Sequence, residues 1–112
     1  MENKLNTIFT PEQHKKLAEL EEIGITISRI VRKGMDLLNK NARAGEPIRE
    51  ISLVNGYRTN VSLDLEYSKL VDKWTETLKI TKAEIMRRAV DIYFEKNGNF
   101  FEEHKKILKE LL

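Results

Sequence analysis

Two short segments carry polar side chains at alternate positions, and those side chains could bind the edges of DNA bases. In residues 58–63 the alternate positions are Arg58, Asn60 and Ser62. An arginine can bond both acceptors of guanine, and an asparagine can donate to and accept from adenine in the major groove. Period two places such groups on one face of a β-strand, roughly 7 Å apart. The pattern predicts a strand whose outer face contacts bases.

A weaker version of the same pattern lies in residues 4–9. Its matching positions, counted back from the start of the following helix, are Lys4, Asn6 and Ile8. Lys4 could bind guanine or a phosphate, and Asn6 corresponds in role to Asn60. Ile8 could touch a thymine methyl group, or it could belong to the core if the alternation is displaced by one residue.

Both segments precede the halves of an internal repeat. Residues 25–37 align with residues 80–92 at a constant spacing, and five of the 13 aligned positions are identical. Gly34 in the first copy corresponds to Ala89 in the second, inside helical stretches. We interpret this position as a close approach of two helices across a pseudo-twofold axis.

A further helix is predicted before each aligned stretch. Thr10 begins one with a Pro and a Gln in its first turn, which is typical of a capping box, and Gly24 ends it. Asp64 caps the other, whose apolar residues up to Trp74 and Leu78 follow one helical face. We expect Trp74 to pack in the core. Each half therefore has the order strand, helix, helix.

The second helix of each half offers an anion-binding end. Thr26 and Thr81 have the positions of N-caps, and Thr81 is followed by Glu84 at capping-box spacing. Free N–H groups at a helix start carry partial positive charge and can hold a phosphate oxygen. The phosphate-binding candidates are Thr26, Ile27, Thr81 and Lys82.

Gly, Pro and Asn residues, which commonly interrupt helices and strands, suggest the remaining boundaries between segments. The expected organisation is repeat 1 in residues 1–41, a linker in 42–57, repeat 2 in 58–97 and a C-terminal helix in 98–112. Within the linker, residues 51–54 are either a third strand entering an Asn-Gly turn or an extended connection. Asn97, Gly98 and Asn99 are expected to stop the preceding helix.

The order of these elements resembles the ribbon-helix-helix repressors of the Arc and MetJ kind. The resemblance rests on the strand, the Asp64-capped helix, the turn at Ile80 and Thr81, and the following apolar helix. It covers residues 58–94 and, less closely, residues 4–38.

In that family two chains each supply one strand, and the outward strand residues contact bases. The resemblance implies a mainly α fold with a short β ribbon, in which the two repeats form an intrachain pseudo-dimer. Tandem members of this kind occur in conjugative plasmids and archaeal viruses. The implied base-contacting residues are Lys4, Asn6, Ile8, Arg58, Asn60 and Ser62.

The amino-acid composition limits the classes of function that the chain could have. Lys and Arg number 20 against 18 for Asp and Glu, so the net charge of +2 permits nucleic-acid binding without arguing for it. The chain has no Cys, no signal-like start and no apolar stretch near 18 residues, so we expect a soluble protein in the cytoplasm, or in the host-cell cytoplasm if the protein is viral. No nucleophile-base pair, phosphate loop or metal-ligand spacing is evident, so no enzyme activity, metal, cofactor or small-molecule substrate is expected.

These patterns predict a sequence-specific double-stranded DNA-binding transcriptional regulator, a repressor in the simplest case. Three alternatives stay open. The chain could be an antitoxin that regulates its own operon and binds a toxin through its C-terminal helix. It could be a conjugation accessory protein, or a small helical interaction module without DNA binding. The C-terminal helix could also join two copies of the chain into a homodimer.

Overall fold

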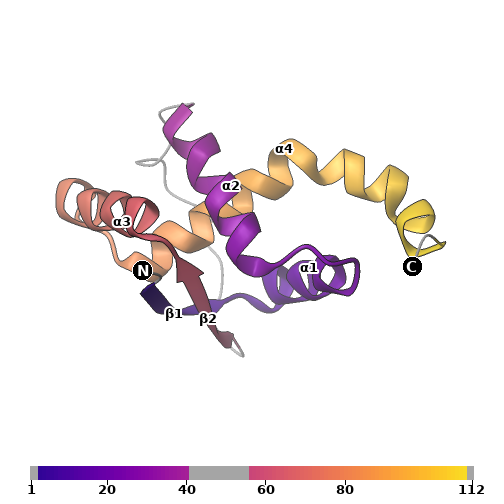
Figure 1. The fold of residues 1–112 in the computed structure, drawn as a ribbon, viewed down its shortest axis with the longest axis horizontal. Helices are drawn as coiled ribbons and strands as arrows, with labels where there is room; N and C mark the ends of the chain where they lie inside the picture. Colours follow the sequence, from indigo (N-terminus) through magenta and orange to yellow (C-terminus); the bar gives the residue numbers. More distant parts are fainter. Residues whose placement is uncertain (1–2, 41–55, 111–112) are drawn as a thin grey trace.

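The two strands predicted from alternation pair with each other in the computed structural model (Figure 1). The model describes residues 3–40 and 56–110 and, within these, the side chains of residues 4–40 and 56–97. Strand β1 spans Asn3–Phe9 and strand β2 spans Tyr57–Leu63. They run antiparallel as a two-stranded ribbon. The suggested third strand in residues 51–54 lies outside the described residues.

The helices of the first half begin and end where local chemistry predicts. Helix α1, Pro11–Glu22, has a complete capping box between Thr10 and Gln13. The chain leaves α1 through Gly24 at φ 87°, a left-handed conformation that glycine adopts at little cost. Helix α2, Ile27–Lys40, follows.

The second half repeats this order with one difference at its end. Helix α3, Leu65–Leu78, is capped by Asp64 and closed by Lys79 in the left-handed region, at φ 58°. Helix α4, Lys82–Glu110, is continuous over 29 residues. The predicted helix stop at residues 97–99 is therefore wrong, although the residues beyond it are helical as expected.

Two local features explain why α4 continues. Gly inside a helix costs only about 1 kcal/mol relative to Ala, which the rest of a long helix can absorb. The Asn97 side-chain amide donates to the Tyr93 carbonyl one turn back, at 2.9 Å, so its polar group is satisfied within the helix. The chain therefore stays in one helix up to Glu110.

The core lies between the inner face of the ribbon and the helices. On that face Thr7, Phe9, Val61 and Leu63 are buried, whereas their neighbours along the strands are exposed or half-buried. The helices contribute the largest share of buried apolar side chains: Leu17, Leu20, Ile30, Val31, Met35, Leu38, Val71, Trp74, Ile85, Met86, Ala89, Val90 and Ile92. The prediction that Trp74 packs in the core is confirmed.

Helices α2 and α4 cross at the centre of the molecule with almost no space between their backbones (Figure 1). A Cβ atom added at Gly34 would lie 2.0 Å from the Ala89 carbonyl oxygen and 2.9 Å from the Ala89 Cα. Real Cβ atoms do not approach backbone atoms so closely, so only glycine fits. The predicted close approach at the Gly34 and Ala89 positions is confirmed.

The pseudo-twofold axis that relates the two repeats passes through the middle of the ribbon. Asn6 and Asn60 occupy equivalent positions when the capping residues Thr10 and Asp64 are aligned, and they are direct partners across the two strands. Gly34 and Ala89 are likewise equivalent and adjacent. The chain thus folds as two strand-helix-helix repeats that share one ribbon and one core.

We expect Gly34→Ala to lower the free energy of unfolding by about 3 kcal/mol, the upper end of typical overpacking costs, because backbone atoms of α4 would have to move. Denaturant unfolding followed by circular dichroism measures this change. Asn39→Ala, at an exposed position of the same helix, is the control and should stay within about 0.5 kcal/mol of the parent. Equal stability of Gly34→Ala and the parent would contradict the packing described at this crossing.

Candidate nucleic-acid interface

The six side chains expected to contact bases share the outer face of the ribbon. The strand register places Lys4 opposite Ser62, Asn6 opposite Asn60 and Ile8 opposite Arg58. Lys4, Asn6, Arg58 and Asn60 are exposed, and Ile8 and Ser62 are half-buried. Ile8 belongs to the outer face, because Thr7 and Phe9 on either side of it are each only 1% exposed.

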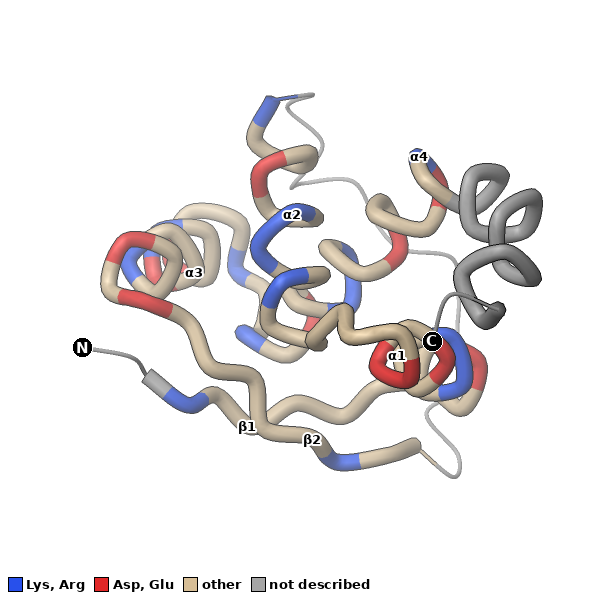
Figure 2. The backbone as a smooth tube through the Cα atoms, turned by 45° about the vertical axis from the view of Figure 1, so that its right-hand side comes forward, with Lys and Arg blue, Asp and Glu red and all other residues tan. Residues whose placement is uncertain are grey.

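This outer face has a simple charge pattern. Both strands carry a cation, Lys4 on β1 and Arg58 on β2, and neither strand contains Asp or Glu. In the described part of the chain the acidic residues lie on the helices (Figure 2), except Asp64, which directly follows β2 as the N-cap of α3. Arg58 forms no ion pair with any residue that the structure describes.

Two hydrogen bonds tie the ribbon to the second helix of each repeat. The Ser62 N–H donates to Ser28 Oγ in the first turn of α2, at 3.1 Å. The guanidinium of Arg87, in the second turn of α4, donates to the Ile8 carbonyl at 3.0 Å. Burial lowers the pKa of the Arg87 guanidinium. Ser62 and Ile8 occupy equivalent positions in the two repeats. Each strand is therefore bound to a helix at the same position, but through different hydrogen-bonding groups.

At the starts of α2 and α4, Thr26, Thr81 and Lys82 are exposed, whereas Ile27 is half-buried against the core. The hydroxyl of Thr26 accepts from the Arg29 N–H at 3.2 Å, and that of Thr81 accepts from the Glu84 N–H at 3.1 Å. Both threonines are exposed N-caps. The other first-turn N–H groups, including that of Ile27, have no partner within their helix ladder.

Lys82 extends the positive end of α4. Its side chain is half exposed, and its Nζ lies 3.3 Å from Asp72 Oδ1 of α3. Exposed ion pairs of this kind contribute about 1 kcal/mol or less. A phosphate group could therefore displace Asp72 at small cost.

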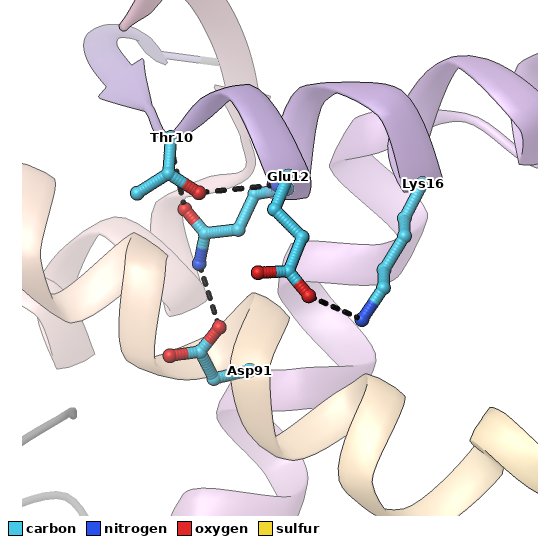
Figure 3. Close-up of polar contacts among 5 residues, drawn as sticks. Thr10, Glu12, Lys16 and Asp91 are labelled. Carbon is cyan, nitrogen blue, oxygen red and sulfur yellow. Dashed lines mark hydrogen bonds and ion pairs between the residues drawn. The ribbon is translucent and has the colours of Figure 1, made fainter. Parts of the chain in front are cut away.

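The first helix of each repeat contacts the second helix of the other repeat at equivalent positions. The Gln13 amide donates to Asp91 Oδ1 at 2.8 Å (Figure 3). It also donates to the Arg87 carbonyl at 3.1 Å. In the other half the Tyr67 hydroxyl donates to the Asp36 carboxylate, at 3.1 and 3.0 Å. These contacts hold α1 against α4 and α3 against α2.

Alignment of the repeats identifies the two aspartates but not their partners. Asp36 and Asp91 are identical residues at the repeat spacing. Their partners differ in residue type and lie far away in sequence, so local patterns give no sign of these contacts. Arg88 differs, because its buried side chain lies 3.5 Å from Glu84 one turn earlier in the same helix, a spacing that is visible in the sequence.

The two carboxylates lie in different surroundings. Burial raises the pKa of the Asp91 carboxyl, and the hydrogen bond from Gln13 and the nearby Lys16 offset part of this effect. Lys16 also pairs with Glu12 at 3.4 Å on the surface of α1 (Figure 3). At the other contact, desolvation and the hydrogen bond to Asp36 raise the pKa of the Tyr67 hydroxyl.

The ribbon end nearest Arg58 carries an aromatic stack. The rings of His14 and Tyr57 lie 3.9 Å apart and almost parallel, at 12°. The side chain of Tyr57 is 47% exposed. His14 therefore contacts the ribbon end from α1. In the described part of the chain no three His, Cys, Asp or Glu residues group as metal ligands would.

The chain has no significant match to a protein-family model, a curated protein or a solved structure. Its candidate site is therefore defined by the geometry of the ribbon and the adjoining helix ends. None of the helices in the described residues combines the length and apolar composition that a membrane span requires.

We expect Asp91→Asn to raise the free energy of unfolding at pH 7. Burial raises the folded-state pKa of the Asp91 carboxyl above its unfolded value. The neutral carboxyl therefore contributes fully to stability below about pH 3.9, and this contribution is lost as the pH rises through the folded-state pKa. Asparagine stays neutral and still accepts from Gln13. The free energies of unfolding of the variant and the parent, measured between pH 3 and pH 8, test this. The difference between them should shrink at low pH. A variant less stable than the parent at pH 7 would show that the Asp91 charge supports the fold.

Proposed function

We propose that this chain is a sequence-specific double-stranded DNA-binding transcriptional regulator, a repressor in the simplest case, that inserts the β1–β2 ribbon into the major groove. One observation carries the proposal. Six side chains of base-contacting type share an outer face that has two cations and no acidic residue. A two-stranded ribbon has the width that the major groove admits.

The pairing of Asn6 with Asn60 supports base recognition. Both side chains are exposed and lie opposite each other on the pseudo-twofold axis. DNA has a local twofold axis of its own, so two amides related in this way can approach neighbouring base pairs from opposite strands. Each amide can donate to and accept from an adenine.

The helix ends supply a second, sequence-independent set of contacts. In the proposed complex the first-turn N–H groups at Thr26, Ile27, Thr81 and Lys82 bind phosphate oxygens on either side of the groove. The hydrogen bonds from Ser62 to Ser28 and from Arg87 to Ile8 fix the ribbon relative to these helices. Phosphate binding would thus set the depth and angle of the ribbon.

This proposal includes membership of the ribbon-helix-helix class, in its tandem form. The order of elements and the shared antiparallel ribbon support this assignment, as does the resemblance in sequence. Such a regulator would act in the cytoplasm, or in the host-cell cytoplasm if the protein is viral.

We expect Arg58→Ala and Asn60→Ala each to weaken binding to the preferred duplex by roughly 5- to 150-fold, the equivalent of about 1–3 kcal/mol per bidentate base contact. Binding to unrelated duplexes should change far less, so both variants should lose sequence preference. Fluorescence anisotropy on duplexes selected from a randomised pool measures both quantities, with the DNA upstream of the gene as a second probe.

The matched control is Lys40→Ala, which removes an exposed cation at the end of α2 farthest from the ribbon (Figure 1). It should leave sequence preference intact. Folded parent protein that binds no duplex from the pool would end the regulator proposal and favour a protein-interaction module.

We expect Lys82→Ala to weaken binding to all duplexes by a similar factor, because a phosphate contact carries no sequence information. The slope of log affinity against log salt concentration should fall by about 1, the value for one lost phosphate contact. Titrations from low to moderate salt measure this slope. An effect confined to one sequence would place Lys82 at a base instead.

A further inference from the structure

The structure holds an isoleucine on the polar face of the ribbon. Ile8 is flanked by Thr7 and Phe9, which are each 1% exposed on the inner face. The Thr7 hydroxyl lies 3.1 Å from the Met86 sulfur, and the Ile8 carbonyl accepts from Arg87. Turning Ile8 inward would expose Phe9 and break both contacts. An apolar side chain is therefore fixed among Lys, Asn and Arg on this face.

Arg58 is the direct cross-strand partner of Ile8. Side chains paired in this way have Cβ atoms about 5 Å apart. Consecutive base pairs are about 3.4 Å apart along the duplex, so the two side chains can reach neighbouring base pairs. In the major groove Arg suits guanine, and an apolar group suits the 5-methyl group of a pyrimidine.

The opposite end of the ribbon has different chemistry. There Lys4 is paired with Ser62, which is the pseudo-symmetric equivalent of Ile8. Neither side chain presents an apolar surface comparable to that of Ile8. Only the Ile8 and Arg58 end can bury a methyl group, although the Asn6 and Asn60 pair between the ends is symmetric in residue type.

We propose that Ile8 and Arg58 together recognise a 5-methylpyrimidine next to a guanine, and that this end fixes the orientation of the chain on its site. The inference rests on the proposed DNA-binding function. The 5-methyl group belongs to thymine or to 5-methylcytosine, which present the same apolar surface in the groove. Ile8 thereby becomes a specificity residue in its own right.

The test uses the duplex selected from a randomised pool by the parent protein. Each thymine is replaced in turn by deoxyuridine, which removes only the 5-methyl group. Parent affinity should fall about four-fold at one thymine adjacent to a guanine, the factor expected for one buried methyl group at about 0.8 kcal/mol. At that position 5-methylcytosine, paired with guanine, should bind more tightly than cytosine by a similar factor.

Variants assign the effect to Ile8. Ile8→Ala should bind the thymine and uracil duplexes equally, and Ile8→Val should keep most of the discrimination. Ser62→Ala, at the equivalent position of the other end, should discriminate as the parent does. Ile8→Ser, which introduces the residue that occupies the equivalent position 62 of β2, replaces Ile8→Ala if thermal unfolding shows that the latter is not folded.

The outcomes separate this inference from the function on which it rests. A parent protein that selects no duplex contradicts DNA binding itself. Tight, sequence-specific binding without any methyl-sensitive thymine overturns only the role of Ile8. That role is also overturned if the Ile8 variants keep full sensitivity to the methyl group.

Discussion

The fold depends on the contact between Gly34 and Ala89. At this crossing the backbones of α2 and α4 touch, and no side chain atom fits at position 34. The contact fixes the distance between the second helices of the two repeats. Their first turns then have set positions beside the ribbon, which is bound to α2 through Ser28 and to α4 through Arg87. Any loosening at the crossing would therefore reach the outer face of the ribbon.

Local sequence patterns were sufficient to predict most of this arrangement. Capping residues act on their own first turn, so Thr10 with Gln13 and Asp64 marked helix starts correctly. The alternation of polar and apolar residues identified the outward-facing side chains of β2 clearly, because Val61 and Leu63 are apolar and their neighbours are polar. On β1 the isoleucine at position 8 obscured the alternation. Only the burial of Thr7 and Phe9 assigns it to the outer face.

Other features could not be predicted because they depend on distant residues or on small energies. Gln13 meets Asp91 across 78 positions of sequence, and no periodicity reports such a contact. The continuation of α4 through Gly98 reflects a cost of about 1 kcal/mol that a long helix tolerates. The base-contacting and phosphate-binding roles lie further still from local patterns. They are supported by the residue types on the outer face of the ribbon and by the register that brings these residues together.

The two halves of this chain are free to diverge, as the halves of a homodimer are not. In a homodimer every substitution appears twice, once on each side of the axis. Here Gly34 faces an alanine, Gln13 corresponds to Tyr67, and Ile8 corresponds to Ser62. The ribbon also forms by folding of one chain, with no association step, so its assembly does not depend on protein concentration. A single mutation can therefore alter one strand alone while the other keeps its chemistry, even in a cell that contains few copies of the protein.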